Sequence, residues 1–175
     1  MEIYSQHEII TALNERYERL INWLENHDDE LFEKGPDGKW TTGEHVQHLI
    51  LSTKPLNQGL RMPRLVLRTT FGKNNRAERT FEETVERYKI KLSEGGTATS
   101  RFVPKPISKT EKPKLIAELK SENEALATII NKWETDDLNI YLLPHPLLGK
   151  LTLREMLFFT IYHTEHHFTA LRLNY

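Results

Sequence analysis

The chain has 175 residues, a net charge of −1 from 24 lysines and arginines against 25 aspartates and glutamates, and no cysteine. This length suffices for one domain with a substantial core and is short for two, so we predict a single domain over residues 1–175. The balanced charge gives no general attraction to nucleic acid or to an anionic membrane, and the lack of cysteine excludes disulfides and a protein thiolate as nucleophile or metal ligand.

The N-terminal residues give no sign of export. Residues 1–6 lack a basic region followed by an apolar core, so no signal peptide is expected. No apolar run approaches the roughly 18–20 residues of a membrane span. We therefore expect a cytoplasmic protein without nucleic-acid or membrane partners, and the absence of cysteine is compatible with that compartment.

Two helices are predicted in the first third of the chain. Apolar residues recur at three- and four-residue steps from residue 7 to about 33, which is typical of an amphipathic helix. Thr41 and Glu44 then form a capping box, so a second helix begins there. Pro55 and Pro63 should kink or interrupt this helix.

The middle of the chain contains a short helix and a long connection. Thr80 with Glu83 forms another capping box, and the helix that it opens is expected to end near Leu92. Residues 94–108 hold two glycines and two prolines, which favour an irregular connection. A connection of this length in a small domain is often functional or mobile.

Two more long helices complete the predicted fold. One is expected over residues 110–133, followed by a linker over residues 136–149. Thr152 with Glu155 makes a third capping box and opens the last helix. No strand is predicted anywhere, so the sequence indicates an all-α protein, a four-helix bundle with long cross-connections.

The last helix carries a histidine pair at metal-ligand spacing. His163 and His167 are four residues apart, which places both imidazoles on one helix face, one turn apart. Met156 and Phe159 share that face, so the pair should lie at the apolar seam. His166 falls about 60° outside the strip and is expected at the rim of a site.

A metal site usually needs a third protein ligand and a position left open for water or substrate. His48, on the predicted second helix, is the best candidate because apolar residues flank it in sequence. His45 lies one turn away from His48 on the same helix. The alternative is that these histidines sit at the core edge and bond to backbone or tyrosine.

Three other histidines are expected at the surface, at a helix start, a helix end and a proline-flanked loop. They are His7, His27 and His145. A basic stripe also falls at helical spacing: Arg61, Arg64 and Arg68, followed by Lys73, Arg76 and Arg79. Such a stripe is usually a solvated face, and the alternative is that it holds an anionic substrate at the mouth of a site.

Two segments resemble the DinB-like family. Residues 40–49, Trp-Thr-Thr-Gly-Glu-His-Val-Gln-His-Leu, resemble the start of that family's second helix. Residues 144–157, followed by residues 162–167, resemble its last helix and the preceding loop. The resemblance covers nearly the whole chain and implies a four-helix bundle in down-up-up-down order. It also implies a divalent metal held by His48, His163 and His167. We expect zinc or nickel, because imidazole suits both.

Characterised members of that family include S-transferases that use bacillithiol, mycothiol or glutathione, together with maleylpyruvate isomerases and proteins called hydrolases by analogy. The resemblance therefore implies a metal-dependent S-transferase or hydrolase that takes a small-molecule substrate and a low-molecular-weight thiol. Because the chain has no cysteine, such a thiol must arrive as a co-substrate. Candidates for proton transfer or for orienting the metal ligands are Glu44, His45, Tyr162 and His166.

Two other functions stay open at this point. One is a metal-binding, stress-related bundle without a catalytic role. The other is a helical interaction protein whose histidines are structural. A homodimer is also left open, since nothing in the sequence decides the oligomeric state.

Overall fold

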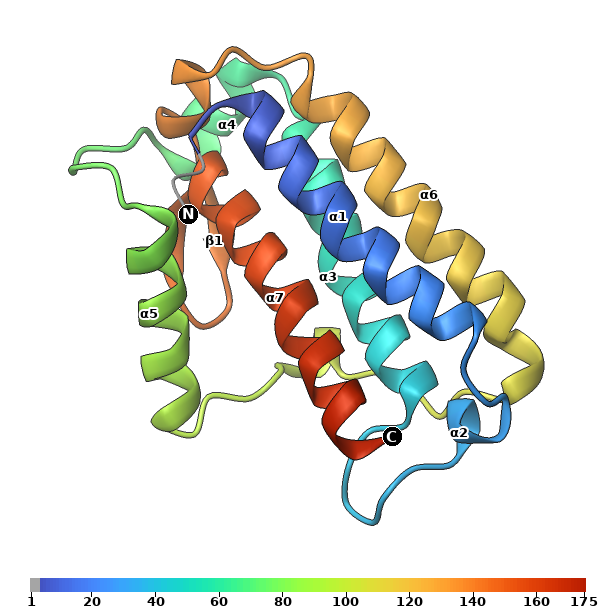
Figure 1. Ribbon diagram of the computed structural model, residues 1–175. Coiled ribbons are helices and arrows are strands. Elements are labelled where there is room, and N and C mark those ends of the chain that lie inside the picture. Colours follow the sequence, from blue (N-terminus) through green and yellow to red (C-terminus); the bar gives the residue numbers. More distant parts are fainter. Residues whose placement is uncertain (1–3) are drawn as a thin grey trace.

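The computed structural model describes residues 4–175, which form a bundle of four long helices. The helices are α1 (Gln6–Glu25), α3 (Thr42–Leu60), α6 (Lys112–Ile130) and α7 (Leu153–Asn174). They run down, up, up and down along the bundle (Figure 1). Both α1 and α3 pack against α6 and α7. The predicted four-helix bundle and its helix order are therefore confirmed.

Threonine–glutamate capping boxes start three of the helices, as the sequence predicts. In each, the threonine side chain accepts the glutamate backbone N–H, while the glutamate carboxylate accepts the threonine N–H. The boxes open α3, α5 (Phe81–Ser93) and α7. A four-residue capping box thus determines where both helices that carry the candidate metal ligands begin.

The first predicted helix is shorter than expected. α1 ends at Glu25, and a separate short helix, α2 (Glu30–Glu33), follows. Lys112 of α6 reaches the segment between them, and its ammonium donates to the His27 carbonyl at 2.6 Å and to the Asp29 carboxylate at 2.6 Å. This long-range contact occupies backbone that a continuing helix would need, so the sequence periodicity alone does not reveal the break.

The two prolines of the second predicted helix behave differently. α3 continues through Pro55 and ends at Leu60. Pro63 then stands immediately before α4 (Arg64–Phe71). The predicted interruption is confirmed at Pro63, where proline suits a helix start, whereas Pro55 does not end its helix.

The prediction that the chain contains no strand is wrong. Residues 142–152 form an antiparallel hairpin of β1 (Leu142–His145) and β2 (Gly149–Thr152). Gly149 adopts a φ of 72°, the left-handed conformation that closes such a three-residue turn. Each strand has four residues, which is too short for an alternating pattern to stand out against the flanking prolines.

The remaining connections include three short 3₁₀ helices: η1 (Ser100–Phe102), η2 (Lys109–Glu111) and η3 (Asp136–Asn139). The first lies in the long connection between α5 and α6 and packs against α3. α5 packs against α7 on the outside of the four-helix bundle (Figure 1). The hairpin, α5 and η1 thus gather around α3 and α7, where the candidate ligands lie.

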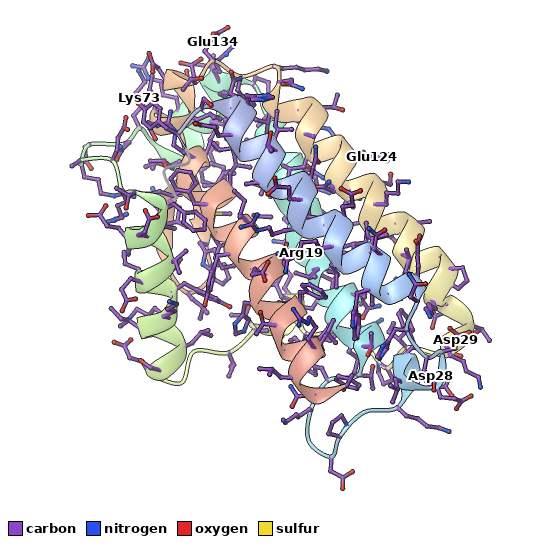
Figure 2. All side chains as sticks on the ribbon, viewed as in Figure 1. Arg19, Asp28, Asp29, Lys73, Glu124 and Glu134 are labelled. Atoms are coloured by element: carbon purple, nitrogen blue, oxygen red, sulfur yellow. The ribbon has the colours of Figure 1, made fainter. Side chains whose placement is uncertain are left out.

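Apolar side chains from all four long helices fill the interior of the bundle, including Leu20, Leu49, Leu119 and Leu157. Figure 2 shows labelled charged side chains at the edge of the molecule, among them Glu134 and Asp29. None of the helices within residues 4–175 is long and apolar enough to cross a membrane.

Candidate metal centre

Three buried histidines converge between α3 and α7. His48 comes from α3, and His163 and His167 lie one turn apart on α7. The Nε2 atom of His163 is 3.1 Å from Nε2 of His48 and 3.0 Å from Nε2 of His167. One ligand nitrogen from each residue lies within 4.8 Å of the other two. The structure therefore brings together three residues that the sequence places on two helices far apart in the chain.

Two of the three nitrogen–nitrogen separations suit bonds to a single divalent ion. Zinc–imidazole bonds of about 2.0–2.1 Å place neighbouring ligand nitrogens about 2.9–3.4 Å apart for bond angles between a right angle and the tetrahedral value. The two Nε2 separations of 3.1 Å and 3.0 Å lie within that range. Three protein ligands also leave a coordination position for a further group.

A backbone carbonyl fixes the tautomer of His48. The Nδ1 atom of His48 lies 2.7 Å from the Phe102 carbonyl oxygen in η1. Because that oxygen only accepts, Nδ1 must carry the proton, and Nε2 presents its lone pair to the other two histidines. This arrangement, in which the far nitrogen of a ligand donates to a carbonyl, is typical of metal-binding histidines.

His45 holds His167 in a comparable way. Their Nδ1 atoms are 2.8 Å apart, so one donates to the other. When His167 presents the Nε2 lone pair to the cluster, its Nδ1 carries the proton and donates to His45. Trp40 stacks parallel to His167 with ring centroids 6.2 Å apart. His45 is thus placed to orient a ligand rather than to contact a substrate.

All three histidines of the cluster are neutral at neutral pH. Burial, reinforced by the neighbouring histidines, holds the pKa values of His163 and His167 well below the ordinary value of 6.5. Burial also lowers the pKa of His48 and brings that of His45 to about 4. Three neutral imidazoles with converging lone pairs are the form in which histidine binds a metal.

A pocket of about 560 Å³ opens above the cluster, and all three histidines line it. Its other walls come from α3, α5, residues 97–102, the hairpin and α7. The lining is largely apolar and includes Leu56, Leu92 and Phe159. The exposed Arg101 also lines the pocket. A metal at the cluster would therefore face a cavity large enough for a small molecule.

The four candidates for proton transfer occupy different places. His166, half-buried, lines the pocket, and burial lowers its pKa. Glu44 is engaged in the capping box of α3, where its carboxylate accepts the Thr41 N–H at 2.7 Å. Neither Glu44, His45 nor Tyr162 is among the residues that line this pocket. Of the four, His166 is the one positioned to meet a bound molecule.

The basic stripe does not reach the pocket, since none of its six members lines it. Arg64 pairs with Asp137 at 2.8 Å and lies over the Trp133 ring. Arg76 and Arg79 pair with the buried Glu155. The alternative that this stripe binds an anionic substrate at the mouth therefore finds no support in the structure. Arg101 is there instead, in a connection whose sequence gave no such signal.

The predicted surface position of His145 is wrong. His145 ends β1 and is only 7% exposed, and its side chain forms part of the pocket wall. The flanking prolines suggested a loop, but they belong to the hairpin that carries this residue inward. His7 is exposed as predicted, whereas His27 is half-buried and stacks on Trp23 with centroids 3.8 Å apart.

Comparisons with known proteins agree with this architecture. A family model described as the DinB superfamily matches residues 8–171. A solved structure described as TT2238, a four-helix bundle protein, is similar with a TM-score of 0.62 and 18% identity, over 97% of this chain and 100% of that one. No protein with a curated description matches the chain.

Proposed function

Because the chain belongs to the DinB superfamily, we propose that it is an enzyme that holds one divalent metal ion, zinc or nickel, through His48, His163 and His167. The observation that carries this proposal is the convergence of three buried, neutral imidazoles at the wall of a pocket of about 560 Å³. Family membership and the cluster are together compatible with a metal-binding protein. The proposed reaction is a thiol-dependent S-transfer. If water rather than a thiol is the nucleophile, the reaction is a hydrolysis.

A metal held by these three histidines would supply Lewis acidity, by which a thiol or water could become a nucleophile near neutral pH. The chain's own residues prepare the site. The Phe102 carbonyl and His45 orient two of the ligands, and Trp40 covers them on one side. The apolar pocket walls exclude water from the reacting groups.

The thiol in this proposal is a co-substrate, because the chain has no cysteine. A low-molecular-weight thiol fits the size of the pocket and the reducing cytoplasm in which we expect the protein to act. His166, which lines the pocket beside the ligands, is the residue best placed to take up or release a proton.

The test is turnover of a panel of electrophiles and amides by the zinc- and nickel-loaded full chain, with and without glutathione. We expect metal-dependent turnover that falls to background in His163→Ala and persists in His7→Ala, whose residue is exposed and away from the pocket. If metal binds but the panel shows no turnover above the metal-free control, the catalytic part of the proposal fails. If no divalent metal binds, the whole proposal fails.

A further inference from the structure

His145 is a buried histidine that the proposed metal chemistry does not use. It is the last residue of β1, paired with Gly149 across the hairpin, and it is 7% exposed. Its ring meets that of Phe159 edge-on, with centroids 4.3 Å apart, and Phe159 in turn stacks on His163 at 4.8 Å. One aromatic ring thus separates His145 from the histidine cluster.

The hairpin turn fixes the tautomer of this histidine. The backbone N–H groups of Leu147 and Leu148 both donate to Nδ1 of His145, each at 3.1 Å. An atom that accepts two hydrogen bonds cannot carry a proton as well, so the ring proton is on Nε2. Burial, together with the nearby Arg87, lowers the pKa of His145 to about 4 and so keeps the ring neutral.

The Nε2–H group of His145 has no hydrogen-bond partner within residues 4–175. The turn occupies the Nδ1 atom of the ring, which leaves Nε2 as the donor of a residue that lines the pocket. A ligand with an acceptor atom in the pocket would give this donor a partner. Side chains in the surrounding wall are mostly apolar: Leu143, Leu147, Met156 and Phe159.

We propose that His145 is a substrate-positioning residue whose Nε2–H donates a hydrogen bond to a carbonyl oxygen of the substrate, and that the substrate's apolar part packs against the hairpin and α7. A hydrogen bond in such a wall is strengthened by the low local polarity, and a pocket built around a donor discriminates against molecules that lack the acceptor. The inference rests on the proposed function in one respect: it takes the pocket beside the histidine cluster as the substrate site.

The test compares two ligands of similar shape, benzylacetone, which has a carbonyl group, and butylbenzene, which has none. Their dissociation constants are measured by ligand-observed NMR on the full chain, both metal-free and zinc-loaded. We expect the ketone to bind about tenfold more tightly than the hydrocarbon in the wild-type protein, which is the size expected for one neutral hydrogen bond.

Two substitutions distinguish the two roles of His145, which are to donate a hydrogen bond into the pocket and to accept hydrogen bonds in the turn. His145→Asn keeps an acceptor for the Leu147 and Leu148 N–H groups but is too short to reach the pocket, so the preference for the ketone should disappear while the fold is retained. His145→Gln extends an amide N–H toward the pocket and should restore part of the preference. The matched control is His7→Asn, which changes an exposed histidine and should leave the tenfold ratio intact.

A long-range nitrogen–proton NMR spectrum reads the tautomer directly and needs no ligand. A proton on Nε2 of His145 is expected, and a proton on Nδ1 would overturn the inference. Retention of the tenfold ratio in folded His145→Asn would overturn it too, as would failure of both ligands to bind the wild-type protein. These measurements are made on the metal-free chain, so they do not depend on metal binding. A failure to bind metal would therefore contradict the proposed function but not this inference.

Discussion

Two buried polar clusters lie on α7, and they differ in how their polar atoms are partnered. At the start of the helix, the carboxylate of Glu155 accepts hydrogen bonds from the Thr152 N–H and from Arg76 and Arg79. Two turns later, the Nε2 atom of His163 lies within hydrogen-bond distance of the Nε2 atoms of His48 and His167. The first cluster is held by ion pairs, while the second consists of neutral imidazoles, the form in which histidine binds a metal.

The difference separates a structural role from a functional one. Burial raises the pKa of Glu155, but the hydrogen bonds from Arg76 and the Thr152 N–H, with the charge of Arg79, outweigh it and leave that pKa below its ordinary value. The carboxylate is therefore ionised and ties the loop before α5 to the start of α7. The histidines are neutral and form no ion pair, so removing one should cost the fold little and the site much.

Metal binding should produce the largest effect. Zinc at a thousandfold excess over its dissociation constant is expected to raise the free energy of unfolding of the wild-type protein by about 4 kcal/mol, because the ion binds the native state. His163→Leu should abolish this gain while changing the stability of the metal-free protein by less than about 1.5 kcal/mol. Urea denaturation with and without zinc measures both. Equal stabilisation of the variant by zinc would contradict the comparison.

The satisfied cluster should behave in the opposite way. Glu155→Gln leaves two arginines without their anion and should lower the free energy of unfolding by about 2–3 kcal/mol, somewhat less than for a fully buried pair, because Arg76 and Arg79 are 28% and 25% exposed. The matched control, Glu165→Gln on the same helix, breaks ion pairs with Arg16 and Arg19 and should cost at most about 1 kcal/mol. Similar losses in the two variants would remove the distinction.

The contact between His45 and His167 should tune the affinity of the site. His45→Phe removes the acceptor that orients His167, so the zinc dissociation constant should rise about 10- to 100-fold with no comparable change in the stability of the metal-free protein. Competition with a chelating dye measures the affinity. An unchanged dissociation constant, as expected for the exposed control His7→Phe, would show that His45 does not orient the ligand.

The smallest effect concerns pH. The pKa of His145 is about 4 in the folded protein, against 6.5 in an unfolded chain, so the unfolded state takes up the proton first as the pH falls. Stability from this group is present above pH 6.5 and declines below it, by roughly 1.5 kcal/mol between pH 6.5 and pH 5. Urea denaturation of the metal-free wild type and of His145→Phe at both pH values measures this loss. Between pH 6.5 and pH 5, the free energy of unfolding of the wild type should fall by about 1.5 kcal/mol more than that of the variant. Parallel pH dependence would contradict the pKa shift.

The sequence predicts the helices and the histidine cluster because both depend on local patterns. Capping boxes such as Thr41 with Glu44 and Thr152 with Glu155 mark where the ligand-bearing helices begin. The four-residue spacing of His163 and His167 then places both on one face. That His48 meets them follows from the packing of α3 on α7, which the family resemblance implied and periodicity alone did not.

The rest of the site depends on contacts between distant parts of the chain. The Phe102 carbonyl, 54 residues away in sequence, bonds to His48 from the short 3₁₀ helix η1, which no sequence pattern indicates. His145 lies in a hairpin whose strands are too short to produce an alternating pattern, so its burial was missed. The position of Arg101 at the pocket was also missed, because no local sequence pattern distinguishes it from other exposed arginines.

The most direct test of the metal centre is calorimetric titration of the metal-free full chain with zinc. We predict a stoichiometry near one ion per chain, with binding lost in His48→Ala, which removes a ligand nitrogen from another helix than the His163–His167 pair. His145→Asn should retain the stoichiometry, because His145 lies beyond Phe159 from the cluster. No binding by the wild-type chain, or undiminished binding by His48→Ala, would contradict the three-histidine site.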